Sequence, residues 1–90
     1  MKEDLETYLN RTVVLDTRSS WVYMGILERV TGSCAVLSQV DVHDSSDTRT
    51  SKELYVIESK ITGIKSNRDR VYVNLSYIVS FSALEDVKHF

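Results

Sequence analysis

The chain contains no proline, one cysteine and only three glycines among its 90 residues. Without proline, it has no rigid linker and no polyproline segment. The single cysteine, Cys34, cannot form a disulfide within the chain, which fits a reducing compartment. The glycines are few enough that each is expected to mark a specific backbone feature, such as a turn or a bulge.

Charge and hydrophobicity set further limits. The 11 basic and 13 acidic residues give a net charge of −2, so no basic surplus indicates nucleic acid, although a local basic rim would be compatible with this balance. No stretch approaches the roughly 20 apolar residues of a membrane span, and the first six residues contain no apolar signal-peptide core. We therefore expect a cytoplasmic protein without a membrane partner.

The length favours a single domain covering residues 1–90. A domain of this size buries only roughly 60–65% of the surface that its unfolded chain exposes. Its core is therefore small, and association with further copies is a natural way to bury more surface.

Short runs rich in β-branched residues predict five strands. They cover residues 12–17, 21–30, 34–42, 70–75 and 78–82. Gly25 in the middle of the second run indicates a bend or bulge, and Gly32 is expected to supply a positive φ in the tight turn at residues 31–33. Strict alternation in the third run would place Val36, Ser38 and Val40 on one face and Leu37, Gln39 and Asp41 on the other.

Two segments are predicted to be helical. In residues 2–9, Leu5, Tyr8 and Leu9 form an apolar stripe, and Asn10 is a plausible stop. The segment 51–63 is ambiguous, because its β-branched content favours a strand. Its apolar spacing favours a helix, with the stripe formed by Leu54, Ile57, Ile61 and Ile64. A capping box beginning at Thr50 and a C-terminal Gly63 decide for the helix.

The order of these elements predicts a mainly β fold, a bent five-stranded antiparallel barrel of the SH3-like kind. An N-terminal helix precedes the barrel, and a second helix is inserted between the third and fourth strands. In such a barrel, closure or near closure removes exposed strand edges.

Over residues 5–84 the sequence resembles the Sm-like family, which includes the LSm and Hfq proteins. The residues that carry the resemblance are Leu5 and Leu9, Val14 and Leu15, Gly25-Ile26-Leu27, the apolar Val30, Cys34, Val36 and Leu37, and Ile78-Val79-Ser80-Phe81. The glycine triplet is similar to the Gly-x-Leu of the family's first motif, and the last four residues are similar to the Ile-Val-x-Ile strand of its second motif.

The resemblance implies a homo-oligomeric ring in which the fourth strand of one subunit pairs with the fifth strand of the next. The interface residues would be Val71, Val73, Ile78 and Phe81. It also implies single-stranded RNA as a ligand at the ring pore, which two connections would approach. Their candidate contact residues are Arg29, Thr31, Ser33, Asn74, Ser76 and Tyr77.

Positions that usually read RNA in this family hold other residues here. The Asp and Asn of the first motif are replaced by Thr31 and Ala35, and the Arg-Gly of the second motif by Asn74 and Leu75. The Lys-His before the final strand is missing, since Lys88-His89 follows that strand. An alternative function is therefore a protein-interaction or scaffold module on the same barrel, without nucleic acid.

Four further groups of residues are candidate sites of chemistry or binding. A metal site or a solvated loop is suggested by Asp41, His43, Asp44 and Asp47, and a nucleophile with its base or a packed thiol by Cys34 with His43 or His89. Trp21 is either an interface anchor or a barrel residue. Either base stacking or a charged hairpin is suggested by the basic stretch at Lys65, Asn67, Arg68 and Arg70, with Tyr72 and Tyr77 nearby. No phosphate loop, zinc-cysteine pair or nucleophile elbow is present, so we expect no enzyme and no cofactor.

Overall fold

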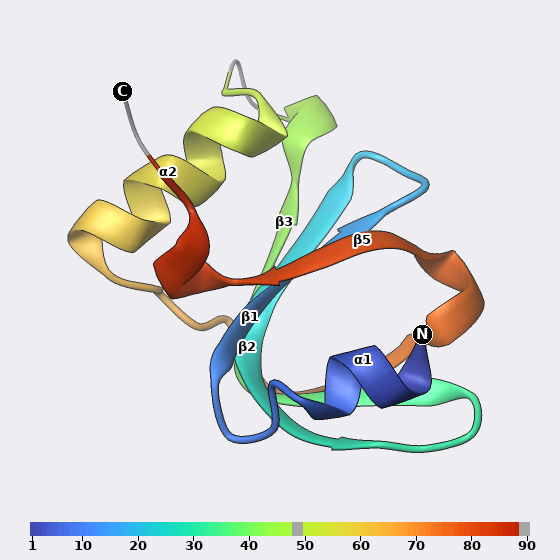
Figure 1. Ribbon diagram of the computed structural model, residues 1–90. Helices are drawn as coiled ribbons and strands as arrows, with labels where there is room; N and C mark the ends of the chain where they lie inside the picture. The colour runs from blue at the N-terminus through green and yellow to red at the C-terminus, as the bar shows by residue number, and fades with distance from the viewer. Residues whose placement is uncertain (48–49, 89–90) are drawn as a thin grey trace.

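The computed structural model describes residues 1–47 and 50–88 and shows a mainly β protein with two helices (Figure 1). The elements in chain order are α1 (Lys2–Glu6), β1 (Thr12–Thr17), β2 (Trp21–Val30), β3 (Cys34–Asp44), α2 (Lys52–Thr62), β4 (Arg68–Asn74) and β5 (Ile78–Ala83). Three short 3-10 turns lie at Ser45–Asp47, Leu75–Tyr77 and Leu84–Asp86. Within the described residues, neither α-helix is long and apolar enough to cross a membrane.

All five strands form one antiparallel sheet in the order β4-β3-β2-β1-β5. The predicted strands and the inserted helix are therefore confirmed, with β1 and β2 at the predicted bounds. The sheet is strongly curved in Figure 1 but does not close, because β4 and β5 are its two edges. Each edge strand therefore forms backbone hydrogen bonds with a neighbouring strand on one side only.

A bulge bends the sheet at Gly25, as its position predicted. Met24 pairs with Asp41 and Ile26 with Ser38, so Gln39 and Val40 of β3 face Gly25 alone. Gln39 has a positive φ of 51°, which belongs to the left-handed region. A Cβ on Gly25 would lie 2.9 Å from the Ser38 carbonyl oxygen. Glycine is therefore required by the close approach of β2 and β3.

The same bulge overturns the predicted alternation of β3. Ala35 and Leu37 lie in the larger of the two hydrophobic clusters, which we call the main core. After the bulge Val40 lies in the same cluster, although strict alternation would place it on the opposite face of the strand. Val40 is completely buried, as is Val36. The extra residue shifts the phase of the strand by one, so Asp41 comes to lie on the other face, toward α2.

Helix α1 is shorter than predicted, ending at Glu6 rather than Leu9. Leu5 is completely buried in the main core, and Tyr8 packs against that core from a turn. Leu9 is 37% exposed, so its assignment to the apolar stripe was wrong. Asn10 ends the segment with a positive φ of 66°, which Asn tolerates better than most residues.

Helix α2 forms as predicted, but its N-cap and its packed face differ from the prediction. The N-cap is Ser51 rather than Thr50, and the Ser51 Oγ accepts a hydrogen bond from the Leu54 N–H at 3.2 Å. Gly63 ends the helix with a φ of 92°. The buried residues of the helix are Val56 and Ser59, while the predicted core residues Leu54 and Ile61 are exposed.

The turn at residues 31–33 uses a side chain instead of a glycine conformation. Gly32 does not have a positive φ, so that prediction was wrong. The Thr31 Oγ1 accepts hydrogen bonds from the N–H groups of Ser33 and Cys34, at 3.2 Å and 2.9 Å. Threonine side chains often replace a backbone turn in this way.

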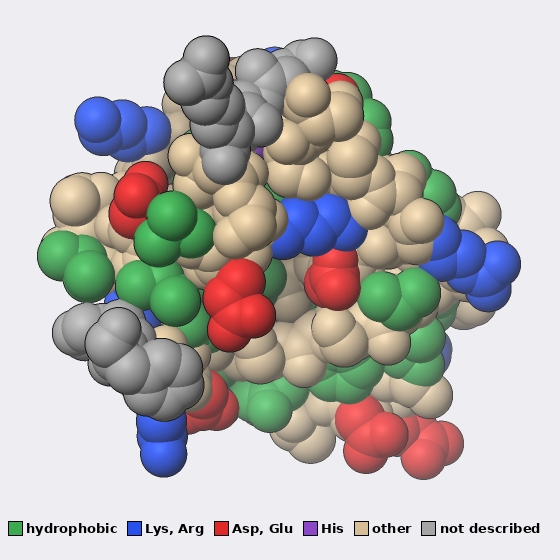
Figure 2. All heavy atoms as spheres, turned by 90° about the horizontal axis from the view of Figure 1, so that it is seen from above, with side chains coloured by type: hydrophobic (Ala, Val, Ile, Leu, Met, Phe, Trp, Pro, Cys, Tyr) green, Lys and Arg blue, Asp and Glu red, His purple; other side chains and the backbone are tan. Residues whose placement is uncertain are grey.

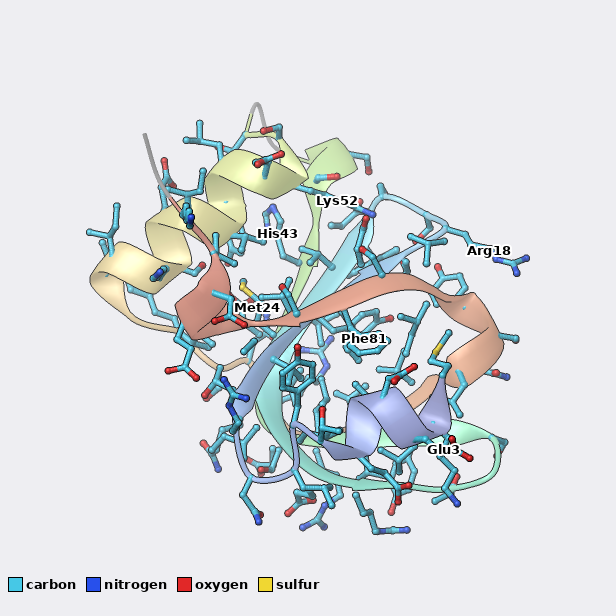
Figure 3. The ribbon with its side chains drawn as sticks, viewed as in Figure 1. Glu3, Arg18, Met24, His43, Lys52 and Phe81 are labelled. Atoms are coloured by element: carbon cyan, nitrogen blue, oxygen red, sulfur yellow. The ribbon has the colours of Figure 1, made fainter. Side chains whose placement is uncertain are left out.

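The curved sheet separates two hydrophobic clusters. The larger one lies on the side that α1 covers, where Phe81 of β5 also lies (Figure 3). The smaller one contains Val14, Val22 and Met24 of the sheet with Val56 of α2, and Leu84 and Val87 pack against it. The protein therefore has three layers in the order α1, sheet, α2.

Candidate functional site

The two connections predicted to form a binding rim do lie side by side. The backbone N–H of Leu75 donates to the Ser33 carbonyl at 2.8 Å, and Asn74 pairs with Cys34 at the end of the β3–β4 ladder. The Asn74 Oδ1 accepts hydrogen bonds from the N–H and the Oγ of Ser76, at 3.0 Å and 2.9 Å. Its carboxamide therefore shapes this connection, and Ser33, Asn74 and Ser76 are exposed there.

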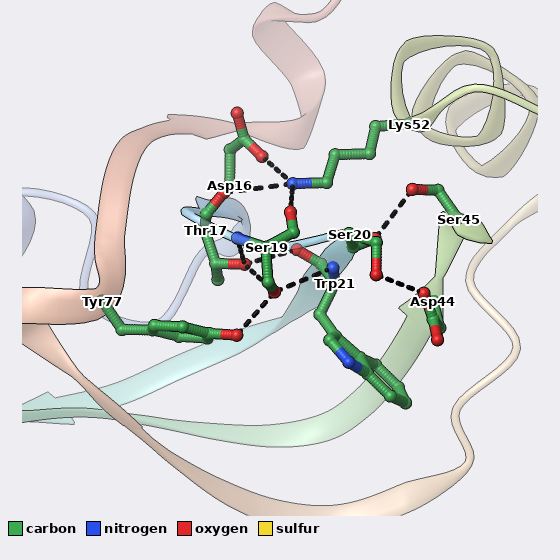
Figure 4. A network of polar contacts seen from close by, with 9 residues as sticks. All are labelled: Asp16, Thr17, Ser19, Ser20, Trp21, Asp44, Ser45, Lys52 and Tyr77. Carbon is green, nitrogen blue, oxygen red and sulfur yellow. Dashed lines mark hydrogen bonds and ion pairs between the residues drawn. The ribbon is translucent and has the colours of Figure 1, made fainter.

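Tyr77 differs from its neighbours because its ring turns into the protein. The ring is half-buried and packs against the main core. Its hydroxyl lies 2.5 Å from the Ser19 Oγ on the β1–β2 connection (Figure 4). The stacking role predicted for Tyr77 would require this contact to break, so Tyr77 is a poor stacking platform in this conformation.

An exposed tyrosine lies instead on the outer surface of β4. Tyr72 is 58% exposed, and the Arg29 guanidinium of β2 donates to its hydroxyl at 3.0 Å. The guanidinium carbon is also 5.6 Å from the ring centroid, within the range of a cation–π contact. Arg29 and Tyr72 both pair with Val36 of the strand between them, so their contact spans a completely buried valine.

A second cation lies on the same strands. The Arg70 guanidinium donates to both carboxylate oxygens of Glu28, at 2.9 Å and 3.4 Å. This hydrogen bond lowers the pKa of Glu28 and raises the pKa of Arg70. We use the term outer patch for Glu28, Arg29, Arg70 and Tyr72. The sequence pattern placed Arg70 and Tyr72 in one stretch, suited either to base stacking or to a charged hairpin. It did not predict their partners on β2, because the bulge beside Glu28 sets that register.

The predicted interface residues mostly face the interior of their own subunit. Val73 and Ile78 are core residues with 3% and 4% exposure, while Val71 and Phe81 are half-buried against the same core. The large hydrophobic side chain that β5 does expose is Val79, at 55%. Val79 has no partner position on β1, because the register shifts between Ile78 and Ser80.

Neither protein-family models nor curated proteins gave a match to this chain.

A network of polar contacts lies beneath the start of α2 (Figure 4). The Lys52 ammonium forms a 2.6 Å ion pair with Asp16 of β1, and it donates to the carbonyls of Thr17 and Ser19. On the neighbouring side, the Ser20 Oγ donates to Asp44 at 2.5 Å, which lowers the pKa of Asp44. These contacts fasten α2 and the end of β3 to the β1–β2 connection, and they leave the lysine no free donor for a ligand.

A second polar group lies between β3 and the middle of α2. Asp41 is 3% exposed, and its carboxylate accepts a 2.6 Å hydrogen bond from the Tyr55 hydroxyl. Burial and this hydrogen bond raise the pKa of Tyr55 to about 12. The His43 ring stacks on the Tyr55 ring at 3.5 Å, and its Nε2 is buried without a hydrogen-bond partner among the described atoms. Figure 3 shows His43 between the sheet and α2.

The candidate sites of chemistry remain dispersed. Among the described residues, no three histidine, cysteine, aspartate or glutamate side chains lie together as metal ligands. The side chain of Asp47 and the residue His89 lie outside the described part of the chain. Cys34 is half-buried as a free thiol beside the Ser33 hydroxyl, and Trp21 is 36% exposed at the start of β2.

Proposed function

We propose that the protein is an Sm-like assembly module whose copies join into a ring and bind single-stranded RNA on the ring surface. The observation that carries the proposal is the sheet order, because β4 and β5 each keep one unpaired ladder side. The resemblance implies pairing of these same two strands between neighbouring subunits.

The two edges are also compatible in length. β4 has seven residues and β5 has six, so one can run along the other over nearly its full length. A head-to-tail contact of this kind uses a different surface on each partner, and it ends only when the ring closes. Closure would satisfy both edges of every subunit, which otherwise present unpaired backbone groups to any other strand.

The outer patch supports RNA as the ligand. Tyr72 offers an exposed ring, and Arg29 beside it offers a cation that can contact phosphate. Both lie close in sequence to the predicted rim residues Thr31 and Asn74, so one strand of RNA could contact the patch and the rim. Repetition of weak contacts around a ring would raise the overall affinity.

The alternative, a scaffold module without nucleic acid, is favoured by a different observation. Ala35 is completely buried, and Leu75 is half-buried and packs against the core, so two of the positions that read RNA in the family hold apolar side chains turned toward the interior. The acidic net charge of −2 points in the same direction.

One experiment separates the two functions. Binding of a labelled single-stranded RNA is measured over a series of salt concentrations with wild type, Tyr72→Ala and Tyr72→Phe. We expect binding that weakens steeply with salt, a loss of about 1–3 kcal/mol in Tyr72→Ala, and near-normal binding in Tyr72→Phe, which keeps the stacking ring. Absence of binding by wild type at low salt would reject RNA and leave the scaffold function.

The ring is tested by the native mass of the protein in solution. Val79→Ser removes an exposed apolar side chain from the β5 edge without touching the core, so the subunit should stay folded while the assembly weakens. A wild-type protein that is monomeric at high micromolar concentration would contradict the ring.

A further inference from the structure

Helix α2 exposes an apolar stripe on the side that faces away from the sheet. Leu54 is 48% exposed, Ile61 is 60% exposed, and Ile57 between them is half-buried. Figure 2, a view from above, shows hydrophobic side chains gathered on the side of the surface where α2 lies in Figure 1. Within residues 1–47 and 50–88, the helix therefore has two apolar faces, and one of them packs against the sheet.

Helical geometry places these two faces opposite each other. Successive residues are turned by about 100° around the axis, so Leu54, Ile57 and Ile61 fall within about 60° of one another. Val56 and Ser59, which are buried against the sheet, fall on the other side. The stripe is thus not a continuation of the packed face.

The spacing of the stripe is that of a coiled-coil seam. Leu54, Ile57 and Ile61 follow steps of three and four residues, which correspond to successive a, d and a positions of a heptad. A seam this narrow is suited to another helix rather than to a broad protein surface, and it covers two turns, about 10 Å of helix.

The charges beside the seam select an orientation for the second helix. The first turn carries Glu53 and the last turn carries Lys60. In an antiparallel pair of identical helices, Leu54 of each copy approaches Ile61 of the other, and Glu53 approaches the opposite Lys60. A parallel pair would instead place like charges side by side, which costs free energy. The Lys60 ammonium donates to the carbonyls of Glu85 and Val87 in its own subunit, which leaves one of its three N–H groups for Glu53 of the second copy.

We propose that α2 is a self-association surface, and that two copies of the chain pair their α2 helices in antiparallel orientation about a two-fold axis. The contact is self-complementary, as two-fold interfaces are. It does not depend on the proposed ring, because it uses α2 and leaves β4 and β5 free. If the ring forms as well, the α2 contact and the contact between β4 and β5 together join more copies of the chain than either contact joins alone.

The test compares two exposed β-branched residues on different surfaces. Ile61→Ser removes from α2 an isoleucine that is 60% exposed, and Val79→Ser removes from β5 a valine that is 55% exposed. Native mass is measured for wild type and both variants over a concentration series, with circular dichroism to check that each variant is folded. We expect Ile61→Ser to raise the dissociation constant of the α2 pair about tenfold or more, since the isoleucine is lost from both copies.

Each outcome decides between the two surfaces. Loss of association in Ile61→Ser with Val79→Ser unaffected supports the α2 pair and rejects the ring. The reverse result rejects the α2 pair and supports the ring. A smaller assembly in both variants supports both contacts, whereas a wild-type monomer at high micromolar concentration rejects both.

Cross-linking tests the orientation separately, in a Cys34→Ser background. Glu58→Cys lies near the two-fold axis of an antiparallel pair and should form a disulfide-linked dimer under mild oxidation. Leu54→Cys should not, because the two introduced thiols would lie at opposite ends of the seam. Efficient cross-linking of Leu54→Cys with none of Glu58→Cys would overturn the antiparallel arrangement.

Discussion

The two faces of the sheet bury different kinds of side chain. On the α1 face most buried residues are apolar, including the completely buried Leu15, Leu27 and Leu37, and the buried polar residue there is Thr17, which follows Val13 and Leu15 on β1. On the α2 face a smaller apolar cluster is accompanied by the buried polar residues Asp41 and Ser59. A pocket of about 300 Å³ that is open to solvent also lies between α2 and the sheet, lined in part by Val14, Val22 and Val56.

This difference shows how the two layers are specified. Apolar contacts are not directional, so the α1 face gains its stability from burial and close packing. Polar contacts require defined distances, so the hydrogen bonds of Lys52 and Tyr55 determine where α2 lies on the sheet. The α1 face therefore supplies most of the stability, while the α2 face fixes the position of the inserted helix. The following substitutions test this comparison.

The largest effect is expected from a cavity on the α1 face. Leu37→Ala should lower the free energy of unfolding by about 2–5 kcal/mol, because Leu37 is completely buried and its neighbours cannot fully collapse. Urea denaturation measures the change. Leu9→Ala, at a leucine with 37% exposure, serves as the control and should cost clearly less. Equal losses in the two variants would contradict a core concentrated inside the curved sheet.

The next effect concerns the hydrogen bond between Tyr55 and Asp41. Tyr55→Phe keeps the ring but leaves a buried carboxylate without its closest donor, so we expect a loss of about 1.5–3 kcal/mol. Tyr72→Phe removes a hydroxyl at an exposed position and should change stability by less than about 0.5 kcal/mol. If both substitutions are neutral in denaturant titrations, the polar contacts do not hold α2.

The same tyrosine predicts a pH dependence. Its folded-state pKa, about 12, lies above the usual value of 10.0, so the folded protein keeps a proton that the unfolded chain releases. The stabilisation is present below pH 10 and is lost as the pH rises toward 12. Alkaline denaturation of wild type should therefore be steeper in this range than that of Tyr55→Phe. Parallel curves would show that Tyr55 does not carry the effect.

A gain in stability is expected at His43. The Nε2 atom is buried and has no hydrogen-bond partner in the part of the chain that the structure describes, while the ring stacks on Tyr55 at an interplanar angle of 3°. His43→Phe keeps an aromatic ring and removes the unpaired nitrogen, so stability should rise by about 1 kcal/mol. His43→Ala should instead lower it, because the stacking is lost. Thermal unfolding of the two variants measures both signs, and a loss in His43→Phe would indicate a hydrogen-bonded nitrogen.

The smallest effect is expected at the N-cap of α2. Ser51→Ala removes the acceptor for the Leu54 N–H and should cost about 1 kcal/mol. Ser51→Asp restores an acceptor, and its charge suits the helix N-terminus, so it should recover the stability. The comparison is made by urea denaturation. If Ser51→Ala and Ser51→Asp behave alike, the cap does not contribute.

Much of the secondary structure could be predicted from local patterns alone. The β-branched runs gave β1 and β2 at their observed bounds, and Gly63 marked the end of α2 correctly. Gly25 marked the bulge, because a glycine inside a strand is unfavourable unless another backbone comes close. The candidate site was less predictable. The pairing of Arg29 with Tyr72 and the inward turn of Tyr77 both depend on residues more than 40 positions away.

The amino-acid sequence by itself determined which segments are strands and helices, since hydrophobic period, capping residues and glycines act over a few neighbouring residues. The tertiary structure decided which face of each element is buried. On α2, Leu54 and Ile61 are as apolar as Val56, and only the position of the helix over Asp41 and Asp16 selects the packed side. On β3, the bulge at Gln39 reverses the phase without a glycine in that strand, because its cause is the contact with Gly25 of β2.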